Sequence, residues 1–330
     1  MPKTVVITGA SAGLGRATAH AFAARGDRVA LLARGQKGLA GAAAEVRAAG
    51  GQALVVPCDV ADAVAVEAAA QQVEAELGPI DVWVNNAMTG ALARFTELEA
   101  DAFQRITDVT YVGVVNGTRA ALRRMVPREA GVVVQVGSSL AYRGIPLQSA
   151  YCGAKHAIQG FTEAVRCELL ADASPVHLTM VQMPALNTPQ FRQVRNRLPQ
   201  HPMPVPPVYE PEVGADAIVW ASEHKRREVW VGASTPAVIV GNGLLPTAAD
   251  HFLAATGLEG QQADMAPDGG PDYLWDPRDE DMGTRGPFSA IAKTRSRQLA
   301  LTKVVPDWAA GMLSAAAGRT FGELQKRLGG

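Results

Sequence analysis

Short apolar runs alternate with longer alanine-rich stretches from Lys3 to about Gly232. The runs are rich in Val, Ile and Leu and are almost continuously apolar, which is typical of strands buried on both faces. The stretches between them are long enough for helices, so the pattern predicts a doubly wound parallel α/β sheet with helices on both faces. About seven strands are expected, at residues 5–8, 29–32, 53–56, 82–84, 132–136, 177–181 and 229–231.

Two segments break this alternation. Residues 189–211 are rich in proline, so neither helix nor strand can persist there, and we expect a loop with at most a short helix at its start. Residues 236–330 form a C-terminal extension after a catalytic domain at 1–235. The middle of the extension, 263–287, is rich in Pro, Gly and Asp and is expected to be irregular. Helical spacing returns at about 308–328.

Charge and cysteine content exclude several classes of protein. The formal net charge is −1 and the sequence pI is about 6.6, without a basic tail, so nucleic acid is not an expected partner. The three cysteines show no metal-ligand spacing, so no metal site is expected, and their odd number suits a reducing cytoplasm. No apolar run approaches the roughly 20 residues of a membrane span, and no secretory leader is apparent.

A glycine-rich turn follows the first predicted strand and opens the first predicted helix. Its sequence is Thr-Gly-Ala-Ser-Ala-Gly-Leu-Gly, residues 8–15. Gly9 permits a tight turn, Gly13 lets the backbone approach a pyrophosphate, and Gly15 allows the helix to pack closely on the strand. Because a helix N-terminus attracts anions, this turn predicts a dinucleotide-binding site.

The end of the second strand bears on which dinucleotide binds. NAD-binding relatives of such folds place a carboxylate there to accept the ribose 2′-hydroxyl. This chain has Arg34 instead. An arginine can bind a 2′-phosphate through two donors, and no carboxylate is present to repel it, so NADP is favoured over NAD. A solvated surface arginine is the alternative.

Tyr151 and Lys155 form the strongest candidate for chemistry. A spacing of four places them on one face of a helix, and a nearby cation favours the phenolate form and lowers the pKa of the tyrosine. Ser138 lies thirteen positions before Tyr151, at the end of a predicted strand, and its hydroxyl could hold a carbonyl oxygen while a proton moves.

Together these motifs resemble the short-chain dehydrogenase/reductase family over roughly residues 1–235. The resemblance also includes Asp59-Val60 after the third strand, Asn85-Asn86-Ala87 after the fourth, Gly137-Ser138-Ser139 after the fifth and Pro184-x-x-x-Thr188 after the sixth. It implies a Rossmann-type fold, with Tyr151 as general acid/base, Lys155 binding the nicotinamide ribose and Ser138 positioning the carbonyl. The cofactor contacts that it implies, together with the turn and Arg34, are Gly9, Ser11, Ala12, Gly13, Leu14, Gly15, Arg34, Asp59, Val60, Asn86, Ala87, Tyr151, Lys155, Pro184, Asn187 and Thr188.

One catalytic position departs from the family pattern. Thr110 stands where members usually have an asparagine whose backbone carbonyl supports a water in a proton relay. Threonine keeps that carbonyl, so we include Thr110 in the expected catalytic set. Met88 replaces the usual glycine after Asn-Asn-Ala and adds bulk close to the cofactor.

The expected function is NADP(H)-dependent hydride transfer between the nicotinamide and a ketone or secondary alcohol. Loop 189–211 should roof a pocket for a medium or large apolar substrate. The candidate lining residues are Met88, Leu140, Tyr142, Ile145, Met183 and Phe191. The alternative is a cofactor-binding protein without redox activity, either a lyase or isomerase or a regulatory binder. The resemblance further implies a homodimer or homotetramer, and the cysteine content and the lack of a leader favour a cytoplasmic location.

Overall fold

The computed structural model describes residues 1–278 and 280–305. Its centre is a seven-stranded parallel sheet in the order β10-β7-β6-β4-β1-β2-β3. The strands are β1 Thr4–Thr8, β2 Arg28–Ala33, β3 Gln52–Pro57, β4 Val82–Asn85, β6 Val132–Ser138, β7 His177–Met183 and β10 Glu228–Trp230. Each coincides with a predicted apolar run, so the parallel α/β prediction is confirmed. The strand order reverses between β1 and β4, which is where ligands bind in open sheets of this kind.

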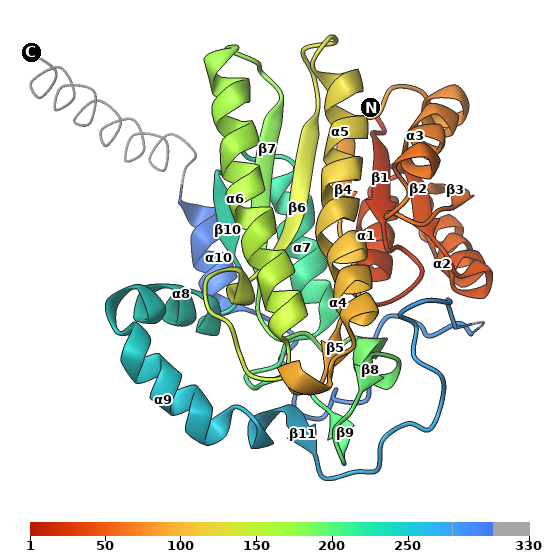
Figure 1. The fold of residues 1–330 in the computed structure, drawn as a ribbon. Coiled ribbons are helices and arrows are strands. Elements are labelled where there is room, and N and C mark those ends of the chain that lie inside the picture. The colour runs from red at the N-terminus through yellow and green to blue at the C-terminus, as the bar shows by residue number, and fades with distance from the viewer. Residues whose placement is uncertain (279, 306–330) are drawn as a thin grey trace, which may run out of the picture.

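Helices cover both faces of the sheet (Figure 1). One face carries α1 Gly13–Ala23, α2 Gln36–Ala48 and α7 Pro211–Ala221, whose apolar side chains form one core layer with the sheet. The other face carries α3 Ala63–Leu77, α5 Gly113–Met125 and α6 Ser149–Ala171 over a second core layer. Helix α4, Ala100–Thr107, continues through a π-helical turn, η2 Asp108–Val112, into α5.

The proline-rich loop begins with a short helix, as expected, in η4 Pro189–Arg192. Two short strands in it were not predicted. Strand β8 Arg195–Asn196 pairs with β5 Ala91–Leu92, and β9 His201–Pro202 pairs with β11 Gln262–Ala263 of the C-terminal extension. The remaining single turns of 3-10 helix are η1 Phe95–Glu97, η3 Ser139–Ala141 and η5 Glu259–Gln261.

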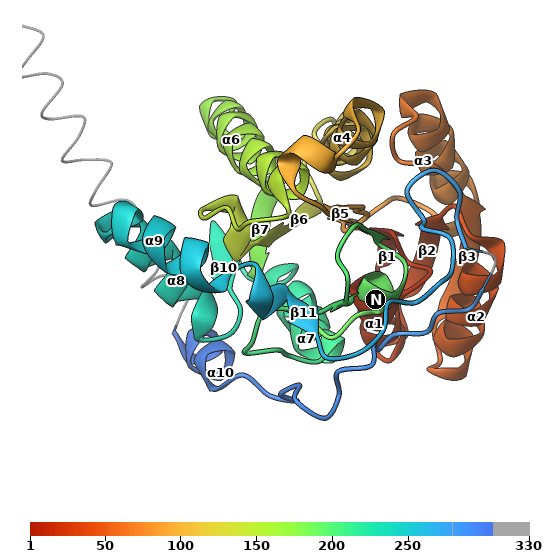
Figure 2. The same ribbon diagram turned by 60° about the horizontal axis from the view of Figure 1, so that its bottom comes forward.

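The C-terminal extension folds back on the sheet. It opens with two helices that were not predicted, α8 Ser234–Leu244 and α9 Pro246–Thr256. Irregular chain follows from 264, as expected, and crosses beneath the sheet toward α2 (Figure 2). Helix α10 Arg297–Val304 then approaches α7, where Lys303 pairs with Asp216. The helix predicted at 308–328 lies outside the described residues. Within the described part of the chain, no helix is long and apolar enough to cross a membrane.

Candidate active site

A cavity of about 910 Å³ opens at the carboxyl ends of the strands. It lies over the point between β1 and β4 where the strand order of the sheet reverses, and it extends to α8 and α9. Most of the residues selected from the sequence line it: Gly9, Ser11, Ala12, Gly13, Leu14, Arg34, Asp59, Val60, Asn86, Ala87, Ser138, Tyr151, Lys155, Pro184 and Thr188. Residues that are far apart in the chain therefore meet in one cavity.

The glycine-rich turn is closed tightly by its neighbours. Gly9 has φ +68, and a Cβ there would lie 2.8 Å from the Ala87 Cα. A Cβ on Gly15 would lie 2.3 Å from the Gly9 carbonyl oxygen, so no larger residue fits without moving backbone. Asn86 completes the turn, since its Nδ2 donates to the Thr8 carbonyl at 2.9 Å. Asn86 therefore stabilises the conformation of the glycine-rich turn as well as lining the cavity.

The turn fits the phosphate-bearing part of a nicotinamide dinucleotide. Helix α1 begins at Gly13, and the N-terminus of this helix lines the cavity through Gly13 and Leu14. A helix N-terminus presents backbone N–H groups and a partial positive charge to an anion. The close packing at Gly9 and Gly15 leaves room above the turn instead of filling it with side chains.

Ser138, Tyr151 and Lys155 meet at the other end of the cavity. Ser138 ends β6, and Tyr151 lies in the first turn of α6, where the Ser138 hydroxyl is close enough to influence the protonation of the Tyr151 phenol. One helical turn on, the Lys155 Nζ lies 5.5 Å from the centre of the Tyr151 ring. The Lys155 Nζ also donates to the Val136 carbonyl at 2.7 Å, which fixes the ammonium beside β6.

Burial dominates the protonation of this pair. It raises the pKa of Tyr151, and the neighbouring Ser138 hydroxyl opposes that rise only in part. Burial also lowers the pKa of Lys155 to about 8. The sequence predicted that Lys155 would lower the pKa of Tyr151. In the structure this pKa is raised instead, because removal of the phenolate from water outweighs a cation that lies over the ring and itself loses charge near pH 8.

Thr110 is fully buried in the π-helical turn η2 and does not line the cavity. Its Oγ1 donates to the Thr89 carbonyl at 2.9 Å and accepts from the Thr89 N–H at 3.1 Å. The side chain therefore joins η2 to the segment that follows β4. Because the hydroxyl is bound to the Thr89 backbone, the contribution of Thr110 that remains expected is that of its backbone carbonyl, which the sequence predicts to support a water in a proton relay. π-Turns inside helices are frequent at functional sites.

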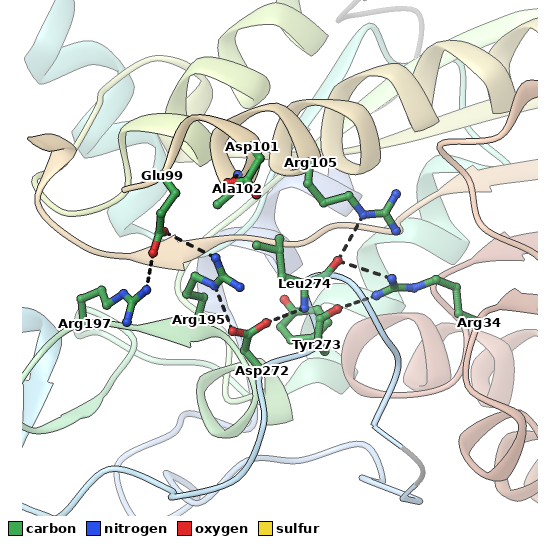
Figure 3. A network of polar contacts seen from close by, with 10 residues as sticks. All are labelled: Arg34, Glu99, Asp101, Ala102, Arg105, Arg195, Arg197, Asp272, Tyr273 and Leu274. Atoms are coloured by element: carbon green, nitrogen blue, oxygen red, sulfur yellow. Dashed lines mark hydrogen bonds and ion pairs between the residues drawn. The ribbon is translucent and has the colours of Figure 1, made fainter. Parts of the chain in front are cut away.

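At the opposite end of the cavity, Arg34 and Asp59 already have protein partners. The two Nη atoms of Arg34 donate to three consecutive backbone carbonyls of the C-terminal extension, those of Tyr273, Leu274 and Trp275. Figure 3 shows the first two of these contacts. Arg105 donates to Asp59. Burial alone would raise the pKa of Asp59, but the hydrogen bonds from Arg105 and the Ala61 N–H hold it below its usual value. The carboxylate therefore stays charged beside the cavity.

Asn187 faces away from the cavity. It is fully buried, and its amide nitrogen donates to Glu210 at 3.0 Å and to Ser289 at 2.9 Å. Its side-chain oxygen accepts from the Phe288 N–H. Asn187 thus ties the segment after β7 to the C-terminal extension, and its side chain is not part of the site proposed below.

The apolar part of the cavity agrees with most of the sequence candidates. Met88, Leu140, Ile145, Met183 and Phe191 line it. Tyr142 does not, because its hydroxyl donates to Glu228 at the edge of the sheet. The loop arginines form ion pairs within the protein, Arg192 with Asp268, Arg195 with Asp272 and Arg197 with Glu99.

Sequence reasoning missed two groups of lining residues. One belongs to α8 and α9: Ala237, Val238, Gly241, Leu245, Ala249, Phe252 and Leu253. Apolar spacing within 234–256 could have revealed these helices. The other belongs to the irregular extension: Tyr273, Pro277, Arg278, Glu280 and Met282. No motif or periodicity marks this second group. Among the described residues no cluster of His, Cys, Asp or Glu could hold a metal ion.

Comparison with known proteins identifies relatives that cover up to about four fifths of this chain. A family model described as short chain dehydrogenase matches residues 3–199. The uncharacterized oxidoreductase YxnA of Bacillus subtilis is 31% identical over 264 residues, 79% of this chain and 74% of the relative. The ketoacyl reductase HetN of Nostoc sp. is 30% identical over 262 residues, 78% of this chain and 90% of the relative.

Among solved structures, an alcohol dehydrogenase from Thermococcus sibiricus complexed with 5-hydroxy-NADP superposes with a TM-score of 0.60 at 26% identity. The match covers 70% of this chain and 96% of that one. The part of this chain without a counterpart there is larger than the part of the relative without one, as a longer extension would produce.

Proposed function

The chain belongs to the short-chain dehydrogenase family of oxidoreductases, and from this premise we propose that it transfers hydride between NADP(H) and a ketone or secondary alcohol, with Tyr151 as general acid/base. Members of this family use a nicotinamide cofactor. The observation that carries the proposal is the meeting of Ser138, Tyr151 and Lys155 in the cavity that the glycine-rich turn also lines.

In the direction of reduction, the bound cofactor would supply a hydride to the carbonyl carbon. The protein supplies the proton and the orientation. The Tyr151 hydroxyl donates its proton to the carbonyl oxygen, and the raised pKa of Tyr151 favours the protonated state that this step needs. The Ser138 hydroxyl, held beside Tyr151, hydrogen-bonds the same oxygen and stabilises the charge that develops on it.

Lys155 then returns a proton toward Tyr151. With a pKa of about 8 it changes its protonation near neutral pH, and it is fixed by the Val136 carbonyl. In oxidation the same groups act in reverse. The Thr110 carbonyl would support the water that connects Lys155 to solvent.

The preference for NADP rests on the charge at the adenosine end of the cavity. Strand β2 is followed by Arg34 and not by a carboxylate, and Arg278 of the extension lines the same cavity. Asp59, the carboxylate on the neighbouring strand end, is neutralised by Arg105. Glu280, which also lines the cavity, pairs with Arg278, so the three arginines Arg34, Arg105 and Arg278 face two carboxylates and leave a net positive charge that favours a 2′-phosphate over a 2′-hydroxyl. The complex of the Thermococcus relative with 5-hydroxy-NADP is consistent with this preference.

The substrate we propose is medium or large and apolar. The cavity continues past Tyr151 along the apolar faces of α8 and α9, where Ala237, Leu245 and Phe252 line it. Such a surface binds carbon chains or rings by removing them from water. Ketoacyl reductase activity is recorded in the name of one relative, and a long-chain ketone fits the same shape.

A substrate screen with NADPH and NADH in parallel tests the proposal. We expect absorbance loss at the nicotinamide band with long-chain ketones, faster with NADPH. Tyr151→Phe should lower turnover at least about 100-fold with NADPH binding retained. Tyr111→Phe, which keeps the edge-on ring contact with Phe161, is the matched control and should keep wild-type turnover. If Tyr151→Phe turns over at the wild-type rate, the mechanism is wrong. If no ketone or alcohol is turned over although NADPH binds, the non-redox alternative is favoured.

We also propose a cytoplasmic homodimer or homotetramer that assembles through the helices holding Thr110 and Tyr151. Sedimentation equilibrium of the full chain measures the mass directly, and a monomer at all concentrations would contradict this part of the proposal.

A further inference from the structure

Part of the C-terminal extension crosses the adenosine end of the cavity. We call residues 272–278 and 280–283 the strap. Figure 3 shows its first part lying between Arg34 on one side and α4 on the other. Arg34 donates to the carbonyls of Tyr273, Leu274 and Trp275, and Arg105 of α4 donates to that of Leu274 at 3.1 Å. Two arginines therefore hold one run of backbone.

Side chains reinforce this upstream attachment. Leu274 is fully buried in an apolar cluster with Ala91, Ala102 and Ile106. Asp272 accepts from the Arg195 Nε at 2.9 Å, which joins the strap to the proline-rich loop. A fully buried leucine contributes far more than a surface ion pair, so the upstream end is a stable anchor.

The downstream end of the strap is attached at the glycine-rich turn. The Gly13 N–H donates to the Gly283 carbonyl at 3.0 Å. Asp281 pairs with Arg16 of α1, whose guanidinium is also bound by Glu45 of α2. The strap thus spans from the end of β2 to the start of α1, the two elements that would bind the adenosine and phosphate parts of a dinucleotide.

Between these attachments the strap forms one wall of the cavity. Pro277, Arg278, Glu280 and Met282 line it together with the glycine-rich turn. The cavity has a volume of about 910 Å³ with the strap in place, so the strap borders the site without filling it.

Arg278 is the cation that this wall contributes. Its side chain is 10% exposed, its Nη1 donates to the Arg192 carbonyl at 3.0 Å, and its Nη2 donates to Glu280 at 3.1 Å. Its Nε is buried and has no hydrogen-bond partner in the described part of the chain. A buried donor without an acceptor is costly, and most buried donors in proteins have one.

We propose that the strap is a clamp that closes over the bound cofactor, and that Arg278 donates a hydrogen bond to one of the phosphate groups of the dinucleotide. The inference rests on the proposed function, because it takes the cofactor to be NADP(H). In this proposal the cofactor enters and leaves when the strap detaches at one end, so the attachments of the strap govern the rate of cofactor release.

The weaker attachment sets where the clamp opens. The downstream end depends on one backbone hydrogen bond and on Asp281, which is 43% exposed, whereas the upstream end includes buried Leu274. Opening therefore begins at 280–283, next to the glycine-rich turn. The Gly283 carbonyl accepts from the Gly13 N–H, a donor that a pyrophosphate could also use. The bound cofactor and the Gly283 carbonyl therefore compete for the Gly13 N–H.

The test measures NADPH binding and release without any substrate, in the Tyr151→Phe background, so that turnover plays no part. The variants are Arg278→Gln, which removes the phosphate ligand, and Asp281→Ala, which releases the downstream end. Arg285→Gln is the matched control, because Arg285 lies in the same extension but pairs with Glu212 and does not line the cavity. Titration of NADPH fluorescence gives Kd, and stopped-flow displacement gives the release rate.

We expect Arg278→Gln to raise Kd about tenfold or more, the usual effect of losing a charge-assisted hydrogen bond. Asp281→Ala should raise the release rate severalfold, and Arg285→Gln should change neither. NADPH should also protect the strap from limited proteolysis. Unchanged Kd and release in Arg278→Gln would overturn the clamp, and tighter binding in either variant would show that the strap is a competitor. If the parent binds no nicotinamide cofactor, the proposed function itself fails.

Discussion

The Arg34 Nη2 donates to the Tyr273 carbonyl at a distance of 2.5 Å, although 239 positions separate the two residues in the chain. This contact gives Arg34 two roles. It anchors the strap, and it leaves a cation at the position that we propose discriminates NADP from NAD. The two roles predict different responses to substitution.

Arg34→Gln should raise the Kd of NADPH about tenfold or more while changing that of NADH by less than about threefold, because only NADPH carries the phosphate that the cation binds. Titration of both cofactors against this variant checks the prediction. Arg47→Gln, at the exposed end of α2, serves as the control. Equal losses for both cofactors would show that Arg34 acts only through the strap.

The glycine-rich turn predicts a sharp difference between two Gly→Ala substitutions. In Gly15→Ala the new Cβ would meet the Gly9 carbonyl at 2.3 Å, so the turn must open and NADPH binding should be lost, with a cost in stability of roughly 2 kcal/mol or more. Gly243→Ala lies on an exposed part of α8 with nothing within 4 Å, and should stabilise the protein by up to about 1 kcal/mol. Urea unfolding and NADPH titration measure both effects. Wild-type affinity in Gly15→Ala would contradict the close packing.

The sequence was sufficient to predict the sheet and to bring together the residues at the end of the cavity where we propose that the chemistry takes place. Strands such as β1 and β6 are continuous apolar runs, and the turn at Gly9 and the pair Tyr151 and Lys155 have spacings that physical chemistry requires. Local patterns of this kind survive in any tertiary context because burial and helix geometry impose them.

Other features of the site could not be predicted in this way, and the clearest case is a tertiary contact that leaves no local pattern in the sequence. The partners of Arg34 are main-chain carbonyls, which every residue possesses, so nothing in the sequence of 273–275 marks them. Helix α8 contains Val238, Ile239, Val240 and two glycines, residues with poor helix propensity, so its composition argues against a helix and only its apolar spacing could have revealed it. The pKa of Tyr151 differed from expectation because burial, not spacing, decides it.

Substitutions of Thr110 should lower the stability of the protein without a comparable loss of turnover. Thr110→Val keeps the shape of the side chain but removes both hydrogen bonds to the backbone of Thr89, and should destabilise the protein by about 1–3 kcal/mol. Thr110→Ser keeps the hydroxyl and should cost less. Because the expected catalytic contribution comes from the backbone carbonyl, turnover by the folded variants should stay within about threefold of wild type. Urea unfolding and steady-state kinetics at a temperature where each variant is folded test this. If turnover by folded Thr110→Val fell about 100-fold, the role would belong to the hydroxyl instead.

The lowered pKa of Lys155 predicts that the free energy of unfolding increases with pH above pH 8. Burial lowers its pKa from 10.5 to about 8 in the folded protein, so between these values the unfolded chain binds the proton and the folded protein does not. The free energy of unfolding should therefore increase as pH rises from 8 toward 10, whereas below pH 8 both states bind the proton and Lys155 adds no dependence on pH. The raised pKa of Tyr151 acts in the opposite direction only above pH 10. Urea unfolding at several pH values compares wild type with Lys155→Met, which shares every other titrating group. Wild type should gain roughly 2–3 kcal/mol relative to the variant between pH 8 and pH 10. Parallel curves for the two proteins would mean that Lys155 keeps its ordinary pKa in the folded state, and the assignment of Lys155 as a proton carrier near neutral pH would fail with it.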